Sequence, residues 1–293
     1  MLIGLGGCSA RKKAIDVDKY EPVLIGITKA GKWVLPPADY NLRIQGDVLP
    51  EISDDLPETS IDKLNVDLLF PVLHGPYGED GTIQGLLEIA NLPYVGSGVL
   101  ASAVAMDKSF AKPIFAAAGM KVADGIVVTS KDKQVAIDDL AFPVFVKPAR
   151  GGSSRGTHKV KSVEALNAAL KDAFLYDHKV MIEQAVVGRE IECAVLESHG
   201  VAKASVVGEI VIDSKFEFYD FEAKYLDGAT TVKIPADIPA DAAEEIREKA
   251  VQAFKALGCS GLARCDFFYT DKGEIIINEI NTMPGFTGTS MYP

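Results

Sequence analysis

The chain has 293 residues, of which 48% are hydrophobic and four are cysteines, and its net charge is −11 at pH 7. A chain of this length can bury a large core and is expected to divide into two or three subdomains. The acidic balance argues against a nucleic-acid partner or an anionic membrane surface, since both require a broad basic surface. No apolar run approaches the ~20 residues that span a bilayer. No signal peptide is recognisable, so we expect a cytoplasmic protein whose scattered cysteines are free thiols.

The first part of the chain, residues 1–103, is predicted to be an α/β unit. Short apolar runs at 23–27 and 66–73 are typical of strands in a buried parallel sheet. A helical pattern follows at 82–90, whereas the acidic, proline-containing segment 47–61 is predicted to be a loop.

A second α/β unit is predicted over residues 104–182. It begins with a helix at 107–118 and continues with an apolar strand at 142–147. A further helix is predicted at 163–173, where Ser162 precedes the helical pattern as its N-cap.

The third unit is predicted over residues 183–293. Its strands are expected near 191–196 and 204–212, and a long helix at 240–257. Between them lies a polar loop at about 216–239 that is rich in aromatic and charged groups. Such a loop is often a lid over an active site, although an ordinary surface loop is an equal alternative.

The end of this unit predicts a β-hairpin. Two β-branched or aromatic runs, 262–269 and 274–281, flank the turn sequence Thr270-Asp271-Lys272-Gly273. If Lys272-Gly273 forms a two-residue loop, the pairing of every residue along the hairpin is fixed. A register slip of one residue would move each side chain to the other face.

This register gathers four polar side chains on one face. Asp266 lies opposite Glu279, and Arg264 lies opposite Asn281, because alternate strand residues share a face. Two carboxylates and an amide are hard oxygen ligands that suit Mg²⁺. The alternative is an exposed hairpin face with a surface ion pair.

A glycine- and serine-rich loop follows the predicted strand that ends at Lys147. Gly151 and Gly152 allow backbone amides to approach a phosphate closely, and Ser153 and Ser154 add hydroxyl donors. The sequence is neither a Walker motif nor a dinucleotide-binding GxGxxG. We predict a phosphate site here, with a flexible hairpin connection as the alternative.

The segment 182–188 resembles a linker with an exposed backbone. Such a hinge commonly binds a purine through main-chain hydrogen bonds, and a carboxylate such as Glu190 can accept hydrogen bonds from ribose hydroxyls. Without other evidence, solvated acidic residues are the simpler reading of Glu183 and Glu190.

Three further candidates stand in predicted loops. His74 follows an apolar strand, where ligands bind in open α/β sheets, although a lone histidine is as often structural. Lys224 lies in the polar loop, within reach of a terminal phosphate. The turn at Pro284-Gly285 presents backbone N–H groups that can stabilise an oxyanion together with Arg264.

Together these motifs resemble the D-alanine–D-alanine ligase family of the ATP-grasp superfamily. The resemblance covers nearly the whole chain and depends on the order of the motifs rather than on any one of them. In chain order they are His74-Gly75 with Glu79-Asp80-Gly81, Met106-Asp107-Lys108, Val146-Lys147-Pro148, Gly152-Ser153-Ser154-Arg155-Gly156, Glu183, Glu190, Glu222-Ala223-Lys224-Tyr225, Arg264-Cys265-Asp266 and Asn278-Glu279-Ile280-Asn281-Thr282-Met283-Pro284-Gly285.

The resemblance implies an α/β ATP-grasp fold of three subdomains, with the nucleotide held between the central and C-terminal sheets. It implies ATP as co-substrate and two Mg²⁺ ions, with Mn²⁺ as a substitute. The residues that it assigns to ATP are Lys108, Lys147, Ser153, Ser154, Glu183, Val186, Glu190 and Lys224, and those that it assigns to the metal are Asp266, Glu279 and Asn281.

For the reaction, the resemblance implies ligation of two D-alanines through an acylphosphate, for peptidoglycan precursors in a bacterial cytoplasm, by a homodimer. Its catalytic residues are Arg264 and Gly285 at the oxyanion, with Ser153 and Tyr225 as positioning groups. Its substrate-binding residues are His74, Ser290 and Met291. Tyr225 resembles the dipeptide-forming members, since members that use D-lactate often carry histidine there, and D-serine is harder to exclude.

The sequence departs from the family pattern in two places. Members carry an acidic segment after the position of Ala10, with a glutamate for the first D-alanine, and a helix after the position of Pro293. The intact flanking motifs favour residues missing from the sequence over a shortened protein. Two alternatives stay open: a related ligase that uses D-lactate or D-serine, and a nucleotide-binding protein that has lost catalysis.

Overall fold

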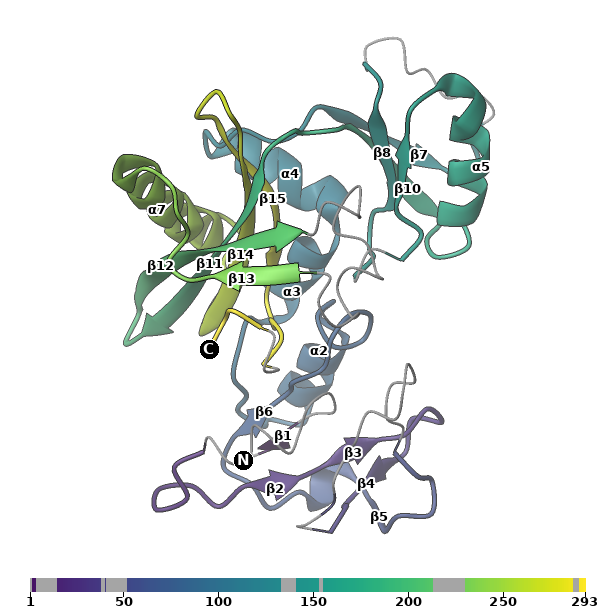
Figure 1. Ribbon diagram of the computed structural model, residues 1–293. Coiled ribbons are helices and arrows are strands. Elements are labelled where there is room, and N and C mark those ends of the chain that lie inside the picture. The colour runs from purple at the N-terminus through teal and green to yellow at the C-terminus, as the bar shows by residue number, and fades with distance from the viewer. Residues whose placement is uncertain are drawn as a thin grey trace.

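The computed structural model describes residues 2–3, 15–37, 40, 52–132, 141–152, 155–212, 230–286 and 290–293. Figure 1 shows the N-terminal elements at the bottom, the central sheet at the upper right and the C-terminal sheet at the upper left. Helices α2, α3 and α4 run up the middle of the molecule between these parts. In the described part of the chain, no helix is both long and apolar enough to cross a membrane.

The N-terminal part contains two small sheets. One is parallel, in the order β2-β1-β6, and the other is antiparallel, in the order β3-β4-β5. The apolar run 23–27 is split between them at Ile25, whose side chain is buried. The predicted loop is wrong at its end, because a strand and a 3-10 helix form before residue 64. The elements are β1 (Leu2–Ile3), β2 (Val23–Leu24), β3 (Gly26–Ile27), β4 (Trp33–Val34), β5 (Glu58–Thr59), η1 (Ile61–Lys63), β6 (Leu69–Phe70) and α2 (Thr82–Ile89).

The central sheet is antiparallel, in the order β7-β10-β8-β9. Helix α5 spans Val163–Ala173, which confirms the predicted helix at both ends. It packs Leu166 and Leu170 against Val144, Val146 and other buried residues of the sheet. The strands are β7 (Gly125–Thr129), β8 (Val144–Pro148), β9 (His158–Val160) and β10 (Lys179–Gln184).

The C-terminal sheet has five antiparallel strands in the order β13-β12-β11-β14-β15. Part of the predicted loop at 216–239 is wrong, since β13 forms there, and residues 213–229 lie outside the described residues. The strands are β11 (Arg189–Ser198), β12 (Val201–Ile212), β13 (Thr230–Lys233), β14 (Leu262–Tyr269) and β15 (Ile275–Asn281), and the helices packed on them are α3 (Val99–Met106), α4 (Lys108–Ala117) and α7 (Ala240–Ala256).

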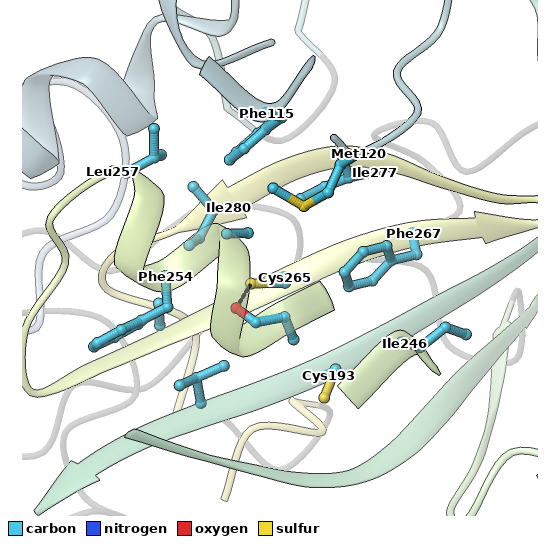
Figure 2. Close-up of a cluster of buried hydrophobic side chains, with 14 of the residues drawn as sticks. Phe115, Met120, Cys193, Ile246, Phe254, Leu257, Cys265, Phe267, Ile277 and Ile280 are labelled. Carbon is cyan, nitrogen blue, oxygen red and sulfur yellow. Dashed lines mark hydrogen bonds between the residues drawn. The ribbon is translucent and has the colours of Figure 1, made fainter. Parts of the chain in front are cut away.

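Helices α3, α4 and α7 cover one face of this sheet with the largest buried core. Figure 2 shows Phe115 of α4 and Phe254 of α7 in the same cluster as Phe267 of β14 and Ile277 of β15. The thiol of Cys265 in this cluster contacts the carbonyl oxygen of Ala250 at 3.6 Å. Because strand side chains alternate, the polar residues of β14 and β15 project from the opposite face.

The hairpin register at the polar residues is confirmed. Arg264 pairs with Asn281, and Asp266 pairs with Glu279. The predicted two-residue turn is wrong, because the loop has three residues, 271–273, closed by a hydrogen bond from the Thr270 N–H to the Glu274 carbonyl at 3.0 Å. Gly273 takes the left-handed conformation, with φ of 78°, that such loops require. A bulge beyond Asp266 adds one residue to β15 and restores the predicted register.

Candidate active site

The polar face of β14 and β15 is organised around Arg264. Its guanidinium holds Asp266 in two hydrogen bonds, Nε to Oδ1 and Nη2 to Oδ2, both at 2.7 Å. Glu192 of β11 lies 3.3 Å from Arg264 Nε. Burial lowers the pKa of the guanidinium, but Asp266 and Glu192 outweigh it and hold that pKa above its ordinary value. Arg264 therefore keeps its charge and bridges two carboxylates that face each other across the strands.

Asn281 and Glu279 complete this polar face. The amide nitrogen of Asn281 donates to Asp266 Oδ2 at 3.0 Å. A rotation of that amide by half a turn would present its oxygen to the same space. Glu279 Oε2 lies 2.9 Å from the ammonium of Lys108, so cations already neutralise both predicted metal-binding carboxylates.

Lys108 joins three parts of the molecule at this point. Helix α4 begins there because the Asp107 carboxylate accepts from the Ser109 N–H at 3.1 Å and caps the helix. The Lys108 ammonium donates to the carbonyl of Gly151 at 3.0 Å and pairs with Glu279. Burial lowers its pKa, but Glu279 outweighs burial and the net pKa is raised. The glycine-rich loop is thus tied to the C-terminal sheet through α4.

A second ionic cluster joins two strands of the central sheet, β8 and β10, to helix α4. The carboxylate of Glu183 on β10 lies 2.6 Å from the ammonium of Lys147 on β8 and 2.6 Å from that of Lys112 on α4. Burial raises the pKa of Glu183, but the two lysines outweigh it and lower that pKa to about 2. The predicted linker at 182–188 is therefore wrong in its first half, because Glu183 is a buried strand residue rather than a solvated one.

Two charged residues of these clusters had no role in the sequence prediction. Lys112 lies one helical turn after Lys108, a spacing that places both on one face of α4. Glu192 lies opposite Asp266 in the structure; the sequence predicted the strand at 191–196 but not its pairing with the hairpin. The helical spacing was the available signal for Lys112, but no pattern in the sequence indicated that its partner would be buried.

The glycine-rich loop is anchored at its start. Arg150 donates to the Asp177 carboxylate through its backbone N–H at 2.9 Å, through Nε at 3.2 Å and through Nη2 at 2.8 Å. Burial raises the pKa of Asp177, but Arg150 outweighs burial and the net pKa is lowered. The next predicted site residues, Ser153 and Ser154, lie outside the described residues.

The loop after β6 reaches the same region. His74 is exposed, and its Nδ1 lies 3.1 Å from the carbonyl oxygen of Met283. Glu79 accepts a hydrogen bond from the Gly75 N–H at 2.5 Å. Burial raises the pKa of Glu79 to about 7, although that hydrogen bond and the charge of Arg264 oppose the shift.

This raised pKa predicts a pH-dependent contribution of Glu79 to stability. Between pH 4.5 and 7 the unfolded chain loses the proton while the folded chain keeps it, so the contribution of Glu79 falls as pH rises. Relative to Glu79→Gln, the wild-type free energy of unfolding should fall by about 3 kcal/mol between pH 4.5 and 7.5. Urea unfolding of both proteins at several pH values measures this difference in stability. A stability difference that does not change with pH would contradict the raised pKa of Glu79.

At the end of the chain, Ser290 lies at the turn of Gly285, and Met291 lies against β12. The hydroxyl of Ser290 donates to the Gly285 carbonyl. Met291 packs on Gly208 so closely that a Cβ there would lie 2.6 Å from its sulfur. The Tyr292 hydroxyl donates to the Val195 carbonyl at 3.1 Å, which holds this segment against the C-terminal sheet.

The remaining predicted residues divide into two groups. Val186 lies in the connection between β10 and β11, and Glu190 lies on β11, two residues before Glu192 and on the same side of the strand. Lys224 and Tyr225, like Ser153 and Ser154, lie outside the described residues.

Among the described residues, no group of three or more His, Cys, Asp or Glu is arranged for a metal. The candidate set is instead two carboxylates and an amide, which matches the way Mg²⁺ binds beside substrate phosphates.

Comparison with known proteins identifies the family. The profile for the "D-ala D-ala ligase C-terminus" matches residues 114–293, and that for the "D-ala D-ala ligase N-terminus" matches residues 4–97. The chain belongs to the D-alanine–D-alanine ligase family. It is 49% identical, over 311 aligned positions, to the D-alanine–D-alanine ligase of Pseudarthrobacter chlorophenolicus, with 96% of this chain and 81% of that relative covered. Since the alignment is longer than this chain, the relative carries internal residues that this chain lacks.

Solved structures show the same fold. The VanG D-Ala:D-Ser ligase from Enterococcus faecalis superposes with a TM-score of 0.82 at 35% identity, covering 100% of this chain and 92% of that chain. The Bacillus anthracis D-alanine–D-alanine ligase, solved with ATP, gives a TM-score of 0.74 at 27% identity, covering 100% of this chain and 88% of that chain. The predicted family and the predicted ATP-grasp fold are both confirmed for this member of the D-alanine–D-alanine ligase family.

Proposed function

We propose that this chain ligates two D-alanines to D-alanyl-D-alanine at the expense of ATP, for peptidoglycan synthesis. The observation that carries the proposal is the polar face of β14 and β15. There Arg264 stands beside Asp266, and Asn281 and Glu279 lie opposite them. Curated D-alanine–D-alanine ligases that are 47–49% identical to this chain support the same reaction. We also propose a cytoplasmic homodimer, as the family resemblance implies.

The nucleotide is proposed to lie between the central and C-terminal sheets. We propose the same three domains that the sequence predicts: an N-terminal substrate domain over 1–103, a central domain over 104–182 and a C-terminal domain over 183–293. The phosphates are held by Lys108, Lys147 and Lys224, with Ser153 and Ser154 in the glycine-rich loop. Glu183 and Val186 face the adenine, and Glu190 faces the ribose hydroxyls.

The residues on the hairpin fit the Mg²⁺ ions that we propose, with Mn²⁺ as a substitute. Asp266, Glu279 and Asn281 would hold them, because carboxylates that attract Arg264 and Lys108 in this structure also attract a divalent cation. When bound, the ions would offset charge on the transferring phosphoryl group. Lys108, displaced from Glu279, is then available to the phosphates.

Arg264 and Gly285 serve the second half of the proposed reaction. The carboxylate of the first D-alanine attacks the γ-phosphorus of ATP and gives an acylphosphate and ADP. The amine of the second D-alanine then attacks the acylphosphate carbonyl. The Arg264 guanidinium and the Gly285 N–H stabilise the resulting oxyanion, and phosphate leaves. His74, Ser290 and Met291 surround the amino-acid substrates, and Ser153 and Tyr225 orient them.

The second substrate is proposed to be D-alanine. Tyr225 favours it over D-lactate, whereas the similarity to a D-Ala:D-Ser ligase structure keeps D-serine as the specific alternative. ADP release with ATP, Mg²⁺ and D-alanine is expected to exceed release with D-serine, D-lactate or L-alanine, and mass spectrometry should detect the dipeptide. If ADP release instead required D-alanine together with D-serine, the protein would be a D-alanine–D-serine ligase.

The catalytically silent alternative makes the opposite prediction. A protein that only binds nucleotide needs no arginine at an oxyanion site, yet Arg264 is held in place by Asp266 and Glu192. ATP binding without any amino-acid-dependent ADP release would favour the silent protein. The residues that this chain lacks relative to its relatives would then be the first place to look for the lost function.

A further inference from the structure

The cluster of Lys112, Lys147 and Glu183 carries an excess positive charge in a buried place. Glu183 and Lys112 are each only 4% exposed. Each lysine ammonium lies 2.6 Å from one oxygen of the single carboxylate, so two positive charges face one negative charge. The Lys112 ammonium and Glu183 Oε1 have no further hydrogen-bond partner among the described residues. An unbalanced buried cation of this kind is costly unless an anion joins it.

The two lysines are not equivalent. Lys147 is the last residue but one of β8, which leads into the glycine-rich loop. Its ammonium also lies 3.4 Å from Asn278 of β15, so it stands between the two sheets. Lys112 lies on the buried side of α4, with Ala111 and Phe115 packed into the core on either side of it. Lys147 is therefore the lysine that can turn toward a phosphate, whereas Lys112 stays paired with Glu183.

This difference suggests that Lys112 compensates the charge of Glu183. If Lys147 moves to the nucleotide, Glu183 loses one of its two cations and would become an uncompensated buried carboxylate without Lys112. We propose that Lys112 is a positioning residue that holds Glu183 in place and so releases Lys147 to bind the nucleotide phosphates. The inference rests on the proposed function only in that the ligand is ATP.

A double-mutant cycle tests this coupling. Lys112→Met, Glu183→Gln and the double variant are compared with the wild type by calorimetric binding of the non-hydrolysable nucleotide AMP-PNP with Mg²⁺. Lys112→Met should weaken binding about tenfold in the wild type, because Lys147 stays on Glu183. It should change binding less than twofold in the Glu183→Gln background, because no carboxylate retains Lys147 there.

Lys121→Met is the matched control. Lys121 lies just after α4 and, like Lys112, pairs with a glutamate, Glu274, at 2.6 Å, but both of these side chains are exposed. This control should leave nucleotide binding unchanged. Thermal unfolding of each variant shows whether it is folded. An equal loss in both backgrounds would mean that Lys112 acts by packing or by direct contact, and would overturn the inference.

The pH dependence of binding gives a second readout. Burial lowers the pKa of Lys112 to about 8, against the attraction of Glu183, and Lys147 and Lys108 add to the lowering. The charged groups that face it are Glu183 from β10, Lys147 from β8 and Lys108 from its own helix. Affinity should therefore fall as pH rises through about 8 in the wild type and stay flatter in Lys112→Met. Parallel profiles would overturn the inference.

The proposed function and this inference fail separately. If AMP-PNP binds with the expected coupling but D-alanine releases no ADP, the role of Lys112 stands and the ligase proposal falls. If D-alanine releases ADP but the two Lys112→Met effects are equal, the ligase stands and the role of Lys112 falls. If the wild type binds no nucleotide, both fall.

Discussion

Replacing Arg264 with alanine is expected to lower turnover by about 10²-fold or more while changing ATP affinity little. The guanidinium is fixed on the polar face of the hairpin by two hydrogen bonds to Asp266. A preorganised cation at that place acts on charge that develops only when the tetrahedral intermediate forms, so its removal should appear in kcat rather than in nucleotide binding. ADP release gives kcat, and calorimetry with AMP-PNP gives the affinity.

The structure adds a second expectation for the same variant. Arg264 neutralises Asp266 and Glu192, which face each other on adjacent strands. Without that charge, Asp266 should bind a divalent cation at least as tightly when no nucleotide is present. Titration of Mn²⁺ followed by electron paramagnetic resonance measures this affinity. A large loss of ATP affinity with unchanged turnover would refute the role assigned to Arg264.

Arg264→Lys is the matched control. Lysine keeps the charge near Asp266 but cannot make two parallel hydrogen bonds to one carboxylate. It should restore the wild-type Mn²⁺ affinity and leave most of the loss in turnover. The pair of variants therefore separates the charge of Arg264 from its fixed direction.

The hairpin shows how a prediction can be correct at the site and wrong at the turn. The register at Asp266 and Glu279 was predicted from a two-residue loop, which the structure replaces with a three-residue loop and a compensating bulge. The register survives because Cys265 and Ile280 must both face the buried core, and a slip of one residue would expose them. Burial of alternate residues therefore determines this register more strongly than turn chemistry does.

Local signals were sufficient for the long helices. Helices α5 and α7 match the predicted elements within one residue at each end, because their apolar periodicity is regular. The two-residue strands of the N-terminal sheets were not separable, because the run 23–27 carries no signal that Ile25 divides two sheets.

The buried ionic cluster could not be predicted from local sequence. Glu183 looked like a solvated residue in a linker, since a carboxylate is rarely buried without a partner. Its partners, Lys112 and Lys147, come from a helix and a strand that are distant in the sequence. Only the fold brings α4, β8 and β10 close enough for the three side chains to meet.

Replacing Asp266 with asparagine is expected to lower kcat/KM by about 10²–10³-fold at millimolar Mg²⁺, because the charge stabilisation that a metal supplies is worth several kcal/mol. Asparagine has nearly the same shape, so the strand pairing with Glu279 and the contact with Asn281 should persist. The Mn²⁺ affinity should fall in parallel with activity, since one of the two carboxylates in the candidate site is lost.

Asp271→Asn is the matched control, because Asp271 is exposed in the turn of the same hairpin. It makes the same change of charge on the same element and should alter neither Mn²⁺ affinity nor turnover. If Asp266→Asn also kept both, the cation site would lie elsewhere. The close contacts of Asp266 with Arg264 and of Glu279 with Lys108 would then be structural ion pairs. If Asp266→Asn alone loses both, those two ion pairs mark the places that a divalent cation takes over when the nucleotide binds.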